Sequence, residues 1–396
     1  MAQHKIINDP VYGFITIDDE LIFKIIAHPY YQRLRRITQM AMAHLVYPGA
    51  VHTRLHHSLG AYHLMCMALQ ELLRKGIIIT EAEQQAAKIA ILLHDVGHGP
   101  YSHALEQVLA PGVHHEKISQ AIIEELNHSF NGQLQMAMQI FEGSYPKKYL
   151  HQLVSSQLDV DRMDYLTRDS FYTGVIEGAV AYDRILKMIT VHDNMIMVEE
   201  KGIYSVEKFL IARRLMYRQV YLHKTVVSAE QMLQRIIKRA KYLGATCHTP
   251  LNTFINEPLH TVSLAQYCSI DDADIMMAIK MWVGHSDKVL ALLCQGILNR
   301  VLLKVRYVTQ LPTEAALYAL QVSVSNTLHI NIDDASWLVF CGSVQTDTYN
   351  FAESPINILY KDGTVKPITA VEDALIHDGM KMNNKKNYIC YPSLTN

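Results

Sequence analysis

The stretch ILLHDVGHGPYSH, residues 91–103, carries the strongest structural signal in this sequence. It begins as the end of an apolar helix, because residues 86–93 leave almost no polar face. It continues as a loop with two glycines and a proline, residues that end helices. His94 and Asp95 therefore stand where a buried helix stops, and at roughly 3.6 residues per turn their side chains splay about 100° apart and can reach one ion. Ionisable groups at the edge of a core are costly unless paired or bound, so we predict a metal ion here.

The composition is that of a charge-balanced globular chain. Its 396 residues include 36 Lys and Arg against 38 Asp and Glu, which argues against a nucleic-acid partner. The 21 histidines exceed what packing alone requires. The six cysteines are scattered without a CxxC pair, as is typical of reduced thiols. The sequence shows neither a signal peptide nor an apolar run of about 20 residues, so we expect a cytoplasmic protein with no membrane partner.

Helical periodicity dominates the first 300 residues and predicts a mainly α fold. We expect long helices over 30–43 and 206–243, and a helix that Thr80 and Glu83 begin with a capping box. A small β-hairpin is expected around His192-Asp193-Asn194. Beyond residue 304 the pattern predicts a smaller α+β region. Its expected strands lie at 322–324, 328–332, 338–340 and 356–360, with a hairpin turn at Asp362-Gly363.

Two imidazoles and two carboxylates form the metal hypothesis. The proposed ligands are His57, His94, Asp95 and Asp161. This donor set suits one divalent ion such as Mn, Fe, Zn or Mg, and four protein ligands leave positions open for water and a phosphate oxygen. Taken singly, each histidine is better interpreted as a hydrogen-bonded core residue. The joint pattern favours the metal site.

Four motifs in chain order resemble one known family. They are Arg54-x-x-His57-Ser-Leu-Gly60, His94-Asp95-x-Gly-His98-Gly-Pro-x-Ser-His103, His115-Glu116 and Asp159-Val-Asp161-Arg162-x-Asp164-Tyr165. The set is similar to the HD-domain phosphohydrolases, and above all to the deoxynucleoside triphosphate triphosphohydrolases, which include the SAM-and-HD-domain proteins and the bacterial dGTPases. KIINDPVYG (residues 5–13) and QRLR (residues 32–35) also resemble that group. The resemblance covers residues 5–243. It implies an HD-domain catalytic core over 1–245, followed by a helical extension over 246–303 and the mixed region 304–396.

The resemblance also implies catalytic roles. The four metal candidates fall on the ligand positions of the family. His103 and His115 fall on its catalytic histidines, and Glu116 is placed to orient His115. His98 lies in the same loop and is expected near the phosphates. Imidazoles suit proton transfer near neutral pH.

Substrate contacts follow from the same resemblance. The positions that match phosphate-binding residues are Arg54, Arg162, Tyr165 and Arg213. Gln39 and Asp169 match residues that hold the sugar 3′-hydroxyl, and Tyr221 matches a tyrosine that leaves no room for a 2′-hydroxyl. Leu222 stands where a polar residue can read the base, so base preference stays open.

Two simpler interpretations remain open for these contacts. Arg213 and Arg214 could form a solvated helix face, since long charged side chains usually face water. Tyr217 and Tyr221, four residues apart on one helix face, could simply pack.

A regulatory nucleotide is a further implication. Lys5, Asn8, Gln32 and Arg35 match parts of a nucleotide site between subunits, although Ala27 stands where an acidic residue reads guanine. A homo-oligomer, dimer or tetramer, is expected with it. The alternative is that the arginines of residues 33–36 form salt bridges at a surface or subunit contact.

These observations predict metal-dependent hydrolysis of deoxynucleoside triphosphates to deoxynucleoside and triphosphate. One alternative is an HD-type phosphodiesterase or phosphatase acting on another nucleotide. The other is a nucleotide-binding or single-stranded nucleic-acid-binding protein that uses the Arg- and Tyr-rich helix 213–224.

Overall fold

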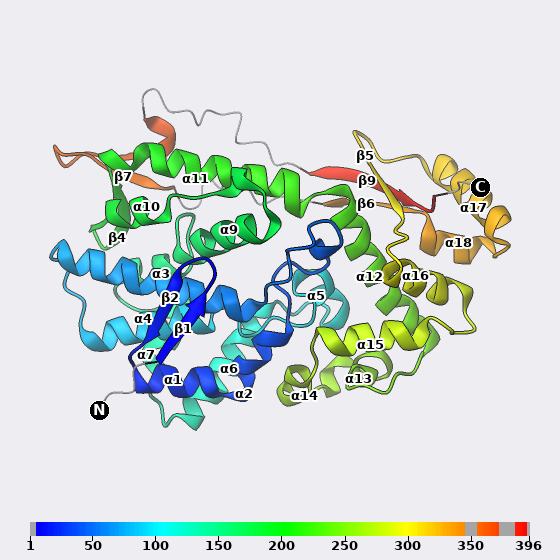
Figure 1. Cartoon of the computed structure of the whole chain (residues 1–396), viewed down its shortest axis with the longest axis horizontal. Helices are drawn as coiled ribbons and strands as arrows, with labels where there is room; N and C mark the ends of the chain where they lie inside the picture. Colours follow the sequence, from blue (N-terminus) through cyan, green and yellow to red (C-terminus); the bar gives the residue numbers. More distant parts are fainter. Residues whose placement is uncertain (1–4, 345–354, 372–384, 394–396) are drawn as a thin grey trace.

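The computed structural model describes residues 5–344, 355–371 and 385–393, and the findings below refer to these ranges. The chain is mainly α-helical with three small sheets, which confirms the predicted fold class (Figure 1). Buried apolar side chains from Ile15 to Cys390 form one continuous core. The division into three domains stays a prediction. Every helix within the described ranges is too short or too polar to cross a membrane.

The first 190 residues form a hairpin and a helical assembly. Its elements are β1 (Lys5–Asp9), β2 (Gly13–Ile17), α1 (Glu20–Ala27), α2 (Pro29–Gln32), α3 (Arg54–Arg74), α4 (Glu81–Leu93), α5 (His103–Leu109), α6 (His115–Ser129), α7 (Gln135–Glu142), α8 (Lys148–Val154), α9 (Val160–Thr173) and α10 (Tyr182–Met188). The capping box of α4 is confirmed: the Thr80 amide donates to Glu83 Oε2 (2.8 Å), and the Glu83 amide donates to Thr80 Oγ1 (3.2 Å). α4 ends at Leu93, so His94 and Asp95 follow its last turn as predicted.

The expected helix over 30–43 is wrong. Helix α2 passes into a 3₁₀ turn, Arg33–Arg36, and the backbone is extended at Ile37. Two hydrogen bonds explain the end of the helix: the Gln39 amide donates to the His52 carbonyl (3.0 Å) and the Arg54 amide donates to the Ile37 carbonyl (2.9 Å). Pairing with a segment distant along the chain therefore outweighs local helix propensity.

The long helical stretch expected over 206–243 is confirmed, and the structure divides it into two helices. The chain forms α11 (Ile203–Met216), a single π-helical turn (Tyr217–Tyr221) and then α12 (Lys224–Leu243). His223 is extended, and its Nδ1 accepts from the Thr225 amide (3.2 Å), which starts α12 as a new helix. Single π turns inside helices often mark functional sites, and this one carries two of the tyrosines considered below.

Two of the sheets join distant parts of the chain. The predicted hairpin is confirmed as β3 (Ile189–His192) and β4 (Met195–Glu199). Strand β7 (Asn357–Leu359) pairs in parallel with β4, and β8 (Val365–Pro367) completes the sheet. The turn at Asp362-Gly363 between β7 and β8 is confirmed, with Gly363 at a φ of +86°. Another sheet has the order β5 (Lys304–Val308), β9 (Lys386–Tyr391), β6 (Phe340–Val344).

The strands expected at 322–324 and 328–332 are wrong, because residues 322–324 lie inside α17 (Glu314–Leu328) and residues 328–332 connect the end of α17 to the start of α18 (Ile332–Leu338). The helices of the second half of the chain are α13 (Leu251–Asn256), α14 (Leu264–Ser269), α15 (Asp272–Trp282), α16 (Lys288–Leu298), α17 (Glu314–Leu328) and α18 (Ile332–Leu338). Thr313 caps α17 by accepting from the Ala316 amide (3.3 Å), and this start signal outweighs the β-branched valines inside the helix. The expected strand at 338–340 begins only at Phe340, whereas the one at 356–360 is present as β7.

Gly60 allows α3 to approach α9 closely. A Cβ atom at this position would lie 2.0 Å from Asp164 Oδ1 and 2.1 Å from an Arg168 guanidinium nitrogen. Both partners are buried, so neither can move away into solvent.

We expect Gly60→Ala to destabilise the protein by about 1–3 kcal/mol, because the added methyl group overpacks a buried ion pair. Urea unfolding followed by circular dichroism measures the change. Gly284→Ala is the matched control, since its Cβ meets nothing within 4 Å. Equal unfolding midpoints for the two variants would contradict the close approach.

Candidate active site

The structure brings the four metal candidates together at one point. His57 comes from α3, His94 and Asp95 follow α4, and Asp161 lies in the first turn of α9. His57 Nε2 lies 3.1 Å from Asp161 Oδ1, 3.3 Å from His94 Nε2 and 3.6 Å from Asp95 Oδ2. His94 Nε2 lies 3.4 Å from Asp161 Oδ1 and from Asp95 Oδ1. An ion with ligand bonds of about 2.1 Å holds neighbouring ligand atoms about 3.0–3.4 Å apart, so His57, His94 and Asp161 could hold a divalent ion. Asp95 lies beside this group and approaches the two histidines with different oxygens.

Hydrogen bonds fix which ring nitrogen faces this point. His57 Nδ1 lies 2.7 Å from Asp164 Oδ2, and His94 Nδ1 donates to the Ile91 carbonyl (2.6 Å). Each Nε2 is therefore left for a ligand bond, an arrangement found around metal-binding histidines. Asp164 in turn accepts from Arg168 (Nε, 3.0 Å), which donates to Asp9 Oδ2 (2.8 Å).

The charges of the cluster call for a cation. Burial by itself lowers the pKa of His57, but the carboxylates of Asp161 and Asp164 outweigh it and raise that pKa to about 10. Burial raises the pKa of Asp161, yet His94 and His57 hold it well below its usual value. Positive charge is strongly favoured between these groups, which a divalent ion supplies.

A second cluster lies beside the first. His98 is stacked on His115 with ring centroids 3.8 Å apart, and His103 stands edge-on to both, at 4.8 Å and 5.1 Å. Glu106 Oε2 lies 3.1 Å from His103 Nδ1 and 3.3 Å from His115 Nδ1. Despite burial, these histidines hold the pKa of Glu106 far below its usual value.

This cluster corrects one assignment. Sequence reasoning gave Glu116 the task of orienting His115, whereas the carboxylate that contacts its ring is that of Glu106. Glu116 instead lines a neighbouring cavity. The missed signal was the spacing of Glu106, three residues after His103 on one helix face.

His98 and Arg54 connect the two clusters. Arg54 is buried, donates to Asp95 Oδ2, and donates through Nε to Ser102 Oγ (2.7 Å). His98 Nε2 lies 3.4 Å from Asp95 Oδ1. Burial and the Arg54 charge hold the pKa of His98 well below its usual value, so its ring is neutral at neutral pH. Arg54, expected at the phosphates, thus also holds one metal candidate in place.

Residues outside the motifs stabilise the loop of residues 94–103 by hydrogen bonds. Arg33 donates to the Val96 carbonyl (3.1 Å) and the His98 carbonyl (2.5 Å). Asp272, the first residue of α15, accepts from the Tyr101 amide (2.7 Å) and the Thr38 amide (2.8 Å). No pattern in the sequence indicated this function of Asp272.

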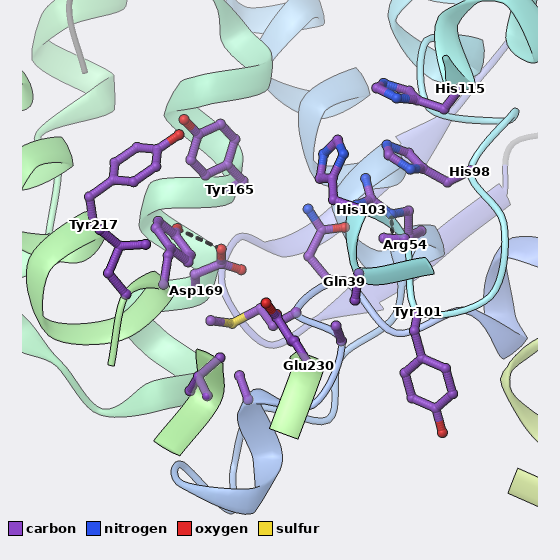
Figure 2. Close-up of a pocket in the computed structure, with 18 of the residues that line it drawn as sticks. Gln39, Arg54, His98, Tyr101, His103, His115, Tyr165, Asp169, Tyr217 and Glu230 are labelled. Atoms are coloured by element: carbon purple, nitrogen blue, oxygen red, sulfur yellow. Dashed lines mark hydrogen bonds between the residues drawn. The ribbon is translucent and has the colours of Figure 1, made fainter. Parts of the chain in front are cut away.

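A cavity of about 630 Å³ opens beside both clusters (Figure 2). The predicted site residues that line it are Gln39, Arg54, Asp95, His98, His103, His115, Asp161, Tyr165, Asp169 and Tyr221. Asp169 Oδ2 accepts from the Tyr221 hydroxyl (2.7 Å), and Asp169 Oδ1 lies 2.7 Å from Nε2 of the buried His52. His52 was missed, since its sequence neighbours give no periodic signal. The size suits a small organic ligand.

Two arginines that were predicted to bind phosphate are not among the residues that line this cavity. Arg162 donates to Asp159 and lines a second cavity of about 500 Å³, which shares Asp95, His115 and Asp161 with the first. Arg213 is only 4% exposed and donates to Gln157 (3.0 Å), so the interpretation as a solvated helix face is wrong for it.

The candidate regulatory residues lie on the N-terminal hairpin and the turns after α1. Lys5 Nζ lies 4.3 Å from the Phe23 ring centroid. Asn8 lies on β1 and pairs with Phe14 of β2. Gln32 donates to the Ile26 carbonyl (2.6 Å) and accepts from Arg35 Nε (2.7 Å). Of the neighbouring arginines, Arg36 forms an ion pair with Asp271, in line with the salt-bridge alternative. The regulatory role itself stays a prediction.

Comparison with known proteins gives consistent matches. The chain matches the HD domain over residues 54–169 and the HD associated region over 180–335. The crystal structure of a phosphohydrolase from Bacteroides thetaiotaomicron is 46% identical, with a TM-score of 0.94 over 98% of this chain and all of that one. The uncharacterised Bacillus subtilis protein YwfO is 31% identical over 99% of this chain and 93% of its own length. The deoxynucleoside triphosphate triphosphohydrolase SAMHD1 of Bos taurus is 32% identical over 56% of this chain and 45% of its own length.

We expect Asp164→Asn to weaken binding of Mn²⁺ by about 10- to 100-fold, because the group that orients His57 loses its charge. Competition with a chromogenic chelator measures the affinity, and a thermal melt checks that the variant is folded. Asp183→Asn removes an exposed carboxylate as the control. Unchanged affinity in a folded Asp164→Asn protein would show that this bond does not support a metal ligand.

Proposed function

Because the chain belongs to the HD-domain family of phosphohydrolases, we propose that it hydrolyses deoxynucleoside triphosphates to deoxynucleoside and triphosphate. The observation that carries the proposal is the cavity of about 630 Å³, the main cavity. It is lined by the metal candidates Asp95 and Asp161, by the three histidines of the second cluster and by the Tyr221–Asp169 pair. A relative that bears the name of this activity, SAMHD1, supports the choice of substrate.

In this proposal one divalent ion is held by His57, His94, Asp95 and Asp161. When bound, it supplies Lewis-acid polarisation of a phosphoryl oxygen and of water. The identity of the ion is left among Mn, Fe, Zn and Mg, since the two nitrogen and two oxygen donors accept each of them.

The histidine cluster handles the protons. Hydrolysis forms a bond from a water oxygen to the α-phosphorus and breaks the bond from that phosphorus to the sugar 5′ oxygen. The leaving oxygen takes a proton, and the attacking water gives one up. Glu106 orients His115 and His103, which are the donors and acceptors for these transfers. The neutral His98 beside them offers a hydrogen bond to a phosphate oxygen without adding charge.

The sugar is assigned to the wall opposite the histidines. The carboxylate of Asp169 keeps free lone pairs after bonding to His52 and Tyr221, and we assign one of them, with Gln39, to the 3′-hydroxyl. The Tyr221 ring stands where a ribose 2′-hydroxyl needs room. The ring centroids of Tyr217 and Tyr221 lie 5.1 Å apart, which confirms that these tyrosines pack together, and the substrate contact of Tyr221 is proposed in addition.

The phosphates are assigned to Arg54, Arg162, Tyr165 and Arg213. Arg54 and Tyr165 line the first cavity, and Arg162 lines the second. Positive charge spread along a triphosphate stabilises the charge that develops on the leaving group. We further propose a cytoplasmic homo-oligomer, with the site of Lys5, Asn8, Gln32 and Arg35 for a regulatory nucleotide.

An HD-type phosphodiesterase or phosphatase on another nucleotide is the second candidate function. This alternative is supported because the metal candidates and the histidine cluster could hydrolyse a phosphate ester whichever sugar lies against Asp169 and Tyr221. A nucleic-acid-binding function has less support, because the net charge of −2 offers little attraction to a polyanion.

The decisive measurement is product analysis by ion-exchange chromatography. We expect Mn²⁺-loaded protein to convert each deoxynucleoside triphosphate to deoxynucleoside and tripolyphosphate and to leave GTP intact, because Tyr221 excludes the 2′-hydroxyl. Asp95→Ala serves as the blank. Release of monophosphate or pyrophosphate, or no reaction with any mixture of the four substrates, would reject the triphosphohydrolase in favour of the second candidate.

A pair of variants tests the proton-transfer assignment. We expect Glu106→Gln to lower kcat by about 10²- to 10⁴-fold, because the carboxylate that orients both histidines is lost. Glu116→Gln is the comparison, with an expected change of less than about 10-fold. The reverse order of the two effects would reassign the role to Glu116.

A further inference from the structure

One carboxylate in the main cavity has no part in the chemistry described above. Glu230 of α12 lines this cavity. Within the described part of the chain, no hydrogen-bond donor or cation contacts its side chain, and burial alone raises the pKa of Glu230 to about 7. Glu230 is half-buried, and a carboxylate partly withdrawn from water without a partner is costly. Such groups are concentrated where ligands bind.

Glu230 belongs to a strip of side chains along α12. Val226, Glu230 and Gln234 are spaced by four residues and all line the cavity, and Gln231 lines it beside them. Figure 2 shows Glu230 on the opposite side of the opening from Tyr165 and His115. The strip therefore lies away from the groups assigned to phosphate and proton transfer.

The chain itself leads from the sugar wall to this strip. Tyr221 is followed by Leu222 and then by α12, and Leu222 lines the same cavity. Leu222, Val226 and Met40 offer apolar surface on which the faces of a base can rest. A base that rests on this apolar surface would turn its polar edge to Glu230, Gln231 and Gln234.

We propose that Glu230, flanked by Gln231 and Gln234, reads the edge of the base and favours guanine. The inference rests on the proposed function, because it takes the sugar to lie against Tyr221. An ionised carboxylate is an acceptor at both oxygens. Guanine presents two adjacent donors on its Watson–Crick edge, N1–H and the N2 amino group. Adenine, cytosine and thymine each place an acceptor beside their donor, so only guanine satisfies both oxygens.

The test is Glu230→Gln, assayed with all four deoxynucleoside triphosphates. A glutamine amide offers one acceptor and one donor, which match N6 and N1 of adenine. We expect kcat/KM for dGTP to fall by roughly 10- to 100-fold, while kcat/KM for dATP is maintained or rises. A variant that was merely misfolded would lose all four substrates together, so the changed order of substrates is the diagnostic result.

Two controls sharpen the test. Lys238→Gln alters an exposed side chain of the same helix and is expected to leave the substrate order unchanged. The triphosphate of deoxyinosine lacks the N2 amino group, so the wild type is expected to use it less well than dGTP, and Glu230→Gln is expected to narrow that difference. If a folded Glu230→Gln protein changes kcat/KM for all four substrates by the same factor, or for none of them, the inference about Glu230 is overturned and the proposed function is not. Absence of any deoxynucleoside triphosphate hydrolysis by the wild type overturns the proposed function and the inference with it.

Discussion

The pairing of buried charges is the constraint on which the rest of this structure depends. His57, Asp164, Arg168 and Asp9 form a row of alternating charge in which each member contacts the next. Removal of one partner from such a row leaves an uncompensated buried charge, at a cost of about 3–5 kcal/mol. The row spans α3, α9 and β1, so it fixes these elements relative to each other. It also explains why α3 carries glycine at position 60, where any larger side chain would displace the ion pair.

The loop of residues 94–103 is held in its conformation by hydrogen bonds to residues distant along the chain. Tyr101 and Ser102 both have a φ of +52°, a conformation that costs non-glycine residues about 1–3 kcal/mol each. The hydrogen bond from Tyr101 to Asp272 and that from Arg54 to Ser102 hold them there. Arg54 also donates to Asp95. The metal candidate Asp95 is therefore connected through Arg54 to the loop at Ser102, and the loop is connected at Tyr101 to Asp272 of α15. The region after residue 245 is therefore part of the support of the site.

Sequence reasoning was accurate where the signal is local. The capping box at Thr80, the helix end at Leu93 and the turns at residues 193–194 and 362–363 each follow from a few adjacent residues, and the structure has them all. It was wrong where a distant segment decides the local conformation. The helix expected over 30–43 is ended by pairing with residues 52–54. Valines 322 and 324 suggested a strand, although the cap at Thr313 sets a helix.

By itself the sequence determined which residue types lie at the buried end of α4 and placed four candidate metal ligands in ordered motifs. Ionisable groups there need partners wherever the chain folds, so their chemistry can be read from their identity. Only the tertiary structure decided the pairings. The contact of Glu106 with His115 and that of His52 with Asp169 depend on segments that meet only in the folded chain. The same is true of the place of Glu230 in the cavity. Neighbours in space leave no periodic trace in the sequence, and for that reason Glu106, His52 and Glu230 became visible only in the folded chain.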